Sequence, residues 1–126
     1  RIDLHVPVKS VAYEQLRERK PAESSEVVRN RVNAARELQK KRYAGTGVHC
    51  NGQLTPAMMR ECCPLTPQAQ TLMAGAFDAL GLSARAHDRI LKVARTIADL
   101  AGEACISELH VAEAIQYRSL DRETLL

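Results

Sequence analysis

The chain has 126 residues, which is enough for one domain with a buried core and too few for two ordinary domains. Hydrophobic residues make up 45% of it but aromatic residues only 3%, so the core is aliphatic and a wholly disordered chain is excluded. The net charge of +3 permits contact with a nucleotide or nucleic acid without requiring it. There is no membrane-spanning apolar run and no signal-peptide pattern, so we expect a soluble, cytoplasmic protein with no membrane partner.

The first residues predict a strand followed by a linker. Residues 2–6 alternate apolar and polar side chains, the pattern of a half-buried strand, and Pro7 ends it. No second strand is predicted to pair with it, so we expect it to belong to a sheet formed by residues upstream of Arg1. The chain begins on Arg1 rather than Met and is expected to be a fragment of a larger protein. Residues 8–24 are charged and ambiguous, with a short helix expected at 13–18.

Capping residues and apolar periodicity then predict a helix over residues 24–42. Ser24 or Ser25 can serve as its N-cap. We expect its buried side to consist of Val28, Val32 and Ala35. Basic residues recur on another face, namely Arg29, Arg36 and Lys40. Such a face indicates either solvated surface or a contact with nucleic acid.

Residues 43–53 carry three glycines and predict a flexible loop. Their spacing differs from the G-x-x-x-x-G-K-[ST] pattern of a phosphate-binding P-loop, so we assign the loop no catalytic role. Two helices capped by Thr-Pro pairs follow: a short one from Thr55 that stops before Pro64, and a longer one from Thr66 that ends at Gly81. The last predicted helix begins at Ser107.

The strongest helical periodicity follows Ser83, whose hydroxyl is suited to cap a helix running to about residue 101. Its apolar stripe consists of Ala86, Ile90, Val93, Ala94, Ile97 and Ala101. Four basic residues are expected on the solvent side of that stripe: Arg85, Arg89, Lys92 and Arg95. Together these patterns predict an all-α bundle behind one orphan N-terminal strand.

Arg85 is the unusual residue of that helix. It falls in the first turn, where the helix macrodipole disfavours a cation by roughly 0.3–1 kcal/mol. A cation beside unbonded helix-end amides suits a site that receives an anion such as phosphate. The alternative is a solvated surface arginine, and local chemistry alone leaves both open.

The four cysteines are expected to be reduced thiols, since Cys62 and Cys63 are adjacent and nothing else indicates secretion. A metal site formed by His49 and Cys50 with that pair lacks the paired C-x-x-C spacing of a zinc site. We therefore predict no metal.

Four stretches in order along the chain resemble one protein family. The most specific covers residues 81–100 and reads Gly-Leu-Ser-Ala-Arg-Ala-x-x-Arg-Ile-Leu-Lys-Val-Ala-Arg-Thr-Ile-Ala-Asp-Leu. The others are 1–6, 23–42 and 110–122. Together they resemble the C-terminal region of the magnesium-chelatase-like AAA+ ATPases, the bacterial ComM/YifB family.

The resemblance implies an AAA+ lid-type helical bundle of four to five helices. Residues 1–23 would be the end of the ATPase core and a linker, 24–122 the lid, and 123–126 a tail. Ser83-Ala84-Arg85 matches the Ser-x-Arg pattern that supplies the sensor-2 arginine in related AAA+ proteins. Arg85 would then contact the ATP γ-phosphate, with Ser83 beside it. The opening Arg-Ile-Asp is similar to a Ser-Arg-Phe-Asp element, which makes Arg1 a candidate arginine finger acting on a neighbouring subunit.

The resemblance also implies cofactors and partners. ATP and Mg²⁺ would be bound mainly by upstream residues, because the chain holds no Walker A or Walker B motif, and the fragment alone would be inactive. The partners would be the upstream AAA+ core, further copies in a homo-oligomer (a hexamer is expected) and DNA. The whole protein would couple ATP hydrolysis to a branch-migration or helicase-type motor in competence and recombination. The alternatives are the ATPase subunit of a chelatase-like metal-insertion or remodelling complex, and a free-standing helical DNA-binding or adaptor domain.

Overall fold

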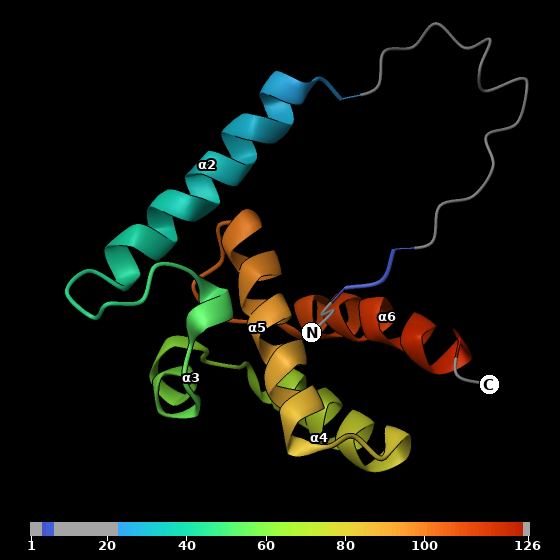
Figure 1. Cartoon of the computed structure of the whole chain (residues 1–126). Helices are drawn as coiled ribbons and strands as arrows, with labels where there is room; N and C mark the ends of the chain where they lie inside the picture. Colours follow the sequence, from blue (N-terminus) through green and yellow to red (C-terminus); the bar gives the residue numbers. More distant parts are fainter. Residues whose placement is uncertain (1–3, 7–22, 125–126) are drawn as a thin grey trace, which may run out of the picture.

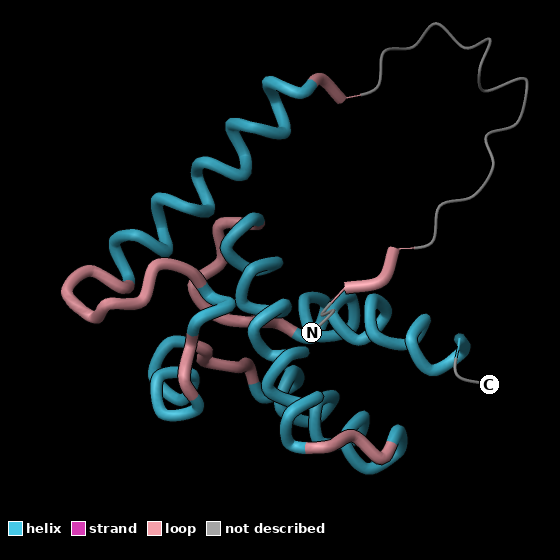
Figure 2. Tube along the Cα trace, viewed as in Figure 1, coloured by secondary structure: helices cyan, strands magenta, loops and turns pink. Residues whose placement is uncertain are grey.

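The computed structural model describes residues 4–6 and 23–124. The elements follow the chain as α2 (Ser25–Arg42), the short 3-10 helix η1 (Asn51–Gln53), α3 (Pro56–Cys62), α4 (Pro67–Leu80), α5 (Ala84–Leu100) and α6 (Glu108–Thr124). These described residues form helices and connecting loops without a strand, as Figures 1 and 2 show, and the all-α prediction is confirmed. None of the helices in the described residues is long and apolar enough to cross a membrane.

The strand predicted at residues 2–6 is not found in residues 4–6, the part of it that the structure describes. Residues 4–6 carry no strand assignment, and residues 1–3 lie outside the described part. The amide of His5 donates to the carbonyl oxygen of Tyr117 in α6, at 3.0 Å. A strand needs a neighbouring strand to pair with along its length. One hydrogen bond to a helix does not replace that partner.

The helix starts follow the capping residues of the sequence. The side chains of Ser24, Thr55, Thr66 and Ser83 each accept a hydrogen bond from the amide three residues further on. Each therefore satisfies one of the amides that a helix start leaves without a partner. Gly81 ends α4 in the left-handed conformation, with φ of 60°, and this turns the chain directly into α5.

The start of α6 is capped by the side chain of His110, which reaches back to Ser107. The backbone amide of Ser107 donates to Nδ1 of His110 at 3.0 Å, and the Ser107 hydroxyl lies 3.2 Å from the same nitrogen. His110 thus takes the place that Glu or Gln holds in a capping box. Ile106 and Val111, which flank this turn as a hydrophobic staple would, are both fully buried in one core cluster.

The core is organised around α5, which contacts α2, η1, α3 and α6, while α4 packs against α6. Its buried side includes Ile90 and Ala94, as the periodicity predicts. An isolated parallel bridge between Leu65 and Ile106 joins the α3–α4 connection to the α5–α6 connection. This bridge holds the start of α4 next to the start of α6.

The predicted buried side of α2 is only partly buried. Ala35 and Gln39 are buried, whereas Val28 and Val32 keep 39% and 38% of their surface exposed. The C-terminal half of α2 crosses the end of α5, and the N-terminal half projects beyond the bundle (Figure 1). The apolar stripe of α2 is therefore longer than the surface that this domain offers it.

Candidate functional site

Arg85 lies at the head of α5, exposed to solvent. The Ser83 hydroxyl accepts from the amide of Ala86 at 3.1 Å, and the Ser83 carbonyl accepts from the amide of His87 at 3.0 Å. Helix geometry gives the amides of Ala84 and Arg85 no acceptor within the helix. An anion placed there would accept hydrogen bonds from both amides. It would also be attracted by the positive end of the helix dipole and by the Arg85 guanidinium.

The predicted Arg85 site is concave and mostly basic. A concavity of about 530 Å³ is lined by Leu54, Pro56, Met59, Arg85, Asp88, Arg89 and Lys92. Three of these are cations, spaced along α5 so that they share one side of the helix, and one is a carboxylate. Leu54 and Met59 are buried core residues, so the concavity is backed by a packed apolar wall. The arrangement is suited to binding an anion.

Lys92 connects this concavity to the 43–53 loop. Its ammonium group donates to the carbonyl oxygen of Gly52 at 3.3 Å. Gly52 belongs to η1, which packs against α5. A ligand that draws Lys92 away would therefore release one of the contacts that hold the loop.

A buried ionic network lies further along α5, centred on Asp99. Both carboxylate oxygens accept from the Arg42 guanidinium, with Nη1–Oδ2 and Nη2–Oδ1 distances of 3.0 and 2.7 Å. Nη2 of Arg95 lies 3.0 Å from Oδ1, and Nδ2 of Asn51 donates to Oδ2 at 2.9 Å. Three segments distant in the chain, namely the end of α2, η1 and α5, therefore meet at one carboxylate.

Arg95 was expected on the solvent side of α5, and this prediction is wrong. Its side chain is only 1% exposed. Besides Asp99, its guanidinium donates to the carbonyl oxygens of Cys62, Glu103 and Ala104, at 3.3, 2.7 and 2.9 Å. These carbonyls belong to the last residue of α3 and to the α5–α6 connection, so the buried guanidinium joins both segments to α5. Arg95 therefore stabilises the packing of the end of α3 and the α5–α6 connection against α5.

The network shifts the ionisation of its members. Burial alone would raise the pKa of Asp99, but the hydrogen bonds from Arg42 and Asn51 and the charges of Arg95 and Arg42 outweigh it, so the pKa lies below its ordinary value. The hydrogen bond to Asp99 raises the pKa of Arg42. The carboxylate and guanidinium are therefore a lasting ion pair at neutral pH.

The 43–53 loop, predicted to be flexible, is anchored at two points. Tyr43 and Asn51 are both buried, and the Tyr43 hydroxyl donates to Oδ1 of Asn51. Nδ2 of Asn51 also donates to Oγ1 of Thr96 at 3.0 Å, and its backbone amide donates to Oε1 of Gln39 at 3.1 Å. A buried asparagine thus fixes a loop whose three glycines indicate freedom.

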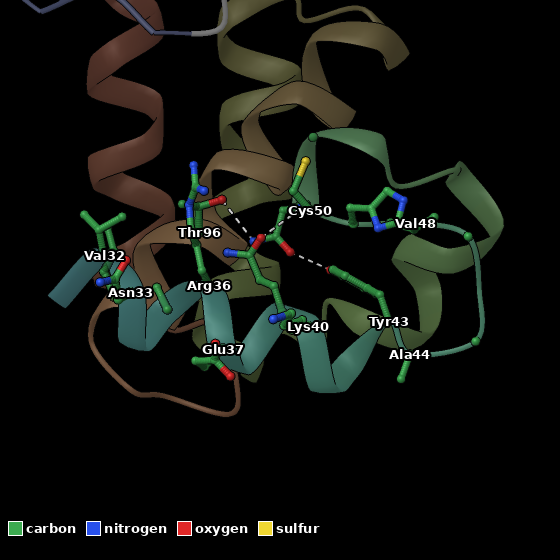
Figure 3. Close-up of a pocket in the computed structure, with 18 residues that line it drawn as sticks. Val32, Asn33, Arg36, Glu37, Lys40, Tyr43, Ala44, Val48, Cys50 and Thr96 are labelled. Atoms are coloured by element: carbon green, nitrogen blue, oxygen red, sulfur yellow. Dashed lines mark hydrogen bonds between the residues drawn. The ribbon is translucent and has the colours of Figure 1, made fainter. Parts of the chain in front are cut away.

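The basic residues of α2 divide between two environments. Figure 3 shows a second concavity, of about 1230 Å³, between the C-terminal half of α2 and the 43–53 loop. Arg36 and Lys40 line it together with Glu37 and Thr96, whereas Arg29 is exposed nearer the helix start and does not. Two of the three predicted nucleic-acid residues therefore line this concavity, and none of the three lines the concavity at Arg85.

The candidate arginine finger and the cysteines remain to be placed. Arg1 lies outside the described residues, so its role as a finger stays a prediction. In the part of the chain that the structure describes, no three His, Cys, Asp or Glu side chains come together in a way that could hold a metal ion. Burial raises the pKa of the Cys63 thiol to about 11, so this residue is an apolar core residue at neutral pH.

The chain is similar to several known proteins over most of its length. It is 43% identical over 102 residues to the uncharacterised protein YifB of Escherichia coli, covering 81% of this chain and 19% of the relative. It is 40% identical over 100 residues to the competence protein ComM of Haemophilus influenzae, covering 79% and 19%. An uncharacterised protein of Mycobacterium tuberculosis is 34% identical over 96 residues, covering 76% and 19%.

The chain thus spans about a fifth of the length of these relatives. A family model described as "Magnesium chelatase, subunit ChlI C-terminal" matches residues 22–118. The match includes all the helical elements of the bundle, apart from the last residues of α6. The chain belongs to this magnesium chelatase C-terminal family, as the corresponding region of a ComM/YifB-like protein.

Proposed function

We propose that this domain is the lid of an AAA+ ATPase and that Arg85 contacts the phosphates of ATP. The observation that carries the proposal is the position of Arg85, exposed at the head of α5 beside two helix-end amides and within a basic concavity. The Ser-x-Arg match to sensor 2 agrees with that position. No catalytic machinery is required of the domain, because Mg²⁺ and most phosphate contacts would come from the upstream part of the full-length protein.

The role of these residues follows from their charges. Arg85 and the α5 amides attract a terminal phosphate and hold the head of α5 against it. Once that phosphate leaves, the attraction is lost, and α5 is released with the helices packed on it. Arg89 and Lys92 extend the positive field along the same side of α5. The domain therefore senses the nucleotide state and converts it into a movement of the whole bundle.

The proposal is tested by replacing Arg85 in the full-length protein. Arg85→Ala is expected to lower kcat for ATP hydrolysis by at least about tenfold, about 1.4 kcal/mol of transition-state stabilisation. Arg85→Lys should recover only part, because an ammonium group cannot donate as a planar fork. Arg60→Ala removes an exposed arginine of α3 outside the concavity and serves as the matched control. Normal hydrolysis by folded Arg85→Ala protein would refute the assignment.

We further propose that the full-length protein is a homo-oligomeric motor that acts on DNA. The name of the relative ComM, a competence protein, supports this, as do the exposed basic side chains of α2. Addition of branched DNA to full-length protein is expected to stimulate ATP hydrolysis and strand movement. Arg36→Glu/Lys40→Glu should weaken that stimulation. Stimulation by a protein partner alone would instead favour a chelatase-like remodelling role.

A further inference from the structure

The first half of α2 presents an apolar strip that the described residues leave uncovered. Val28 and Val32 lie on the same helical line as Ala35 and Gln39, which dock on the bundle. Val27, beside them, is 50% exposed. The strip therefore continues the α2–α5 interface past the end of α5, into solvent. Apolar side chains at docking spacing on a projecting helix indicate a partner.

The charges on α2 describe that partner. The helix holds six basic residues and two acidic ones. Arg42 is paired with Asp99, and Arg31 with Glu23 at 2.7 Å. Three basic residues remain exposed beside the strip, namely Arg29, Arg36 and Lys40. A complementary surface is apolar at its centre and acidic at its edge.

The same chain carries a surface of this kind at the start of α6. Leu109 is 76% exposed, more than any other large hydrophobic side chain in the described residues. Glu108 is exposed directly before it in the sequence, and Glu103 is exposed in the connection that leads from α5 to α6. No Lys or Arg occurs anywhere in residues 96–117. We call Glu103, Glu108 and Leu109 the acidic patch.

The two surfaces do not cover each other within one molecule, since Val32 and Leu109 are both exposed. Two copies of α2 placed face to face would bring like charges together, and so would two acidic patches. A contact between α2 of one copy and the acidic patch of the next has neither problem. Such a contact is head-to-tail, and it leaves one of each surface available for further copies.

We infer that the apolar strip of α2, centred on Val32, docks on the acidic patch of a second copy of this chain. Leu109 of the neighbour would lie against Val28 and Val32, and Glu103 and Glu108 would face the basic residues of α2. The inference is independent of Arg85 and of nucleotide binding.

The test uses photo-cross-linking in the full-length protein. The photoreactive residue p-benzoylphenylalanine replaces Val32, and isotope-labelled and unlabelled protein are mixed so that mass spectrometry separates links between molecules from links within one. The expected product joins position 32 of one copy to residues 103–109 of another. The same photoreactive residue in place of Asp78, exposed on α4, is the control and should give no such product.

Charge reversal makes the test specific. Arg29→Glu/Arg36→Glu in the photoreactive copy should lower the yield several-fold. Glu103→Lys/Glu108→Lys in the partner copy should restore it. Links that stay within one molecule, or a yield equal to that of the Asp78 control, would overturn the inference. If charge reversal on α2 weakens DNA binding and leaves the cross-link yield unchanged, the strip is a nucleic-acid surface and the inference fails.

Discussion

The buried carboxylate of Asp99 gives the sharpest test of how this fold is held together. Its side chain is fully buried and accepts hydrogen bonds or ion pairs from Arg42, Arg95 and Asn51. Asp99→Asn keeps the shape of the side chain but leaves the Arg95 guanidinium, 1% exposed, without its counter-charge. Removing one partner of a buried pair typically costs about 3–5 kcal/mol. Because a whole domain is stable by roughly 5–15 kcal/mol, this substitution is expected to remove a large part of its stability.

Urea denaturation followed by circular dichroism measures this change in unfolding free energy. Asp78→Asn removes an exposed carboxylate of α4 and should stay within about 0.5 kcal/mol of the parent. The double variant Arg95→Met/Asp99→Leu should recover only part of the loss, because Arg95 also serves the carbonyls of Cys62, Glu103 and Ala104. A loss of less than about 1 kcal/mol in Asp99→Asn would refute the view that the network stabilises the docking of α2.

Three further outcomes follow from the same structure. Folding lowers the pKa of Asp99, so the stability that its carboxylate contributes is complete above the unfolded pKa of about 3.9 and is lost as the pH falls through the lower folded pKa. Urea titrations from pH 6 to pH 2 should therefore show that the unfolding free energy falls less with acid in Asp99→Asn than in the parent. Gly81→Ala, at φ of 60°, should destabilise the domain by roughly 1–2 kcal/mol, whereas Gly75→Ala inside α4 meets no atom within 4 Å and should stabilise it by about 0.5–1 kcal/mol. A lowered melting temperature for Gly75→Ala, or an unchanged one for Gly81→Ala, would contradict the respective prediction. Maleimide should modify exposed Cys50 rapidly and buried Cys63 only on unfolding, and equal rates by mass spectrometry would show that Cys63 is not core.

The helices could be predicted from the sequence because their signals are local. Ser24, Thr55, Thr66 and Ser83 each act on an amide three residues away, so the capping residues mark where four helices begin. The C-terminal glycine of α4 is local in the same sense. The alternating pattern at residues 2–6 is equally local, but a strand also needs a distant strand to pair with, and residues 4–6 are not in a strand.

The network could not be predicted because its partners are distant. Arg95 and Asp99 are four residues apart, a spacing that favours an ion pair on a helix and could have drawn attention to both. Nothing local indicates that Arg42, 57 residues away, completes the pair, or that Asn51 joins it. The same holds for α2, where periodicity marks an apolar stripe but does not reveal how far the bundle extends beneath it.

Helix α2 packs against the bundle only through its C-terminal half, so its N-terminal half moves with any rotation of that docked part. Eighteen residues at about 1.5 Å each give a helix of roughly 27 Å, of which the ten residues before Ala35 extend about 15 Å beyond the docked part. Because the ion pair between Arg42 and Asp99 fixes the docked part to α5, a rotation of α5 by about 10° would carry the free end, about 15 Å beyond the docked part, through roughly 2.5 Å relative to that part. A small angular change at the core of the bundle thus becomes a displacement of atomic size at a surface that no residue of α5 reaches.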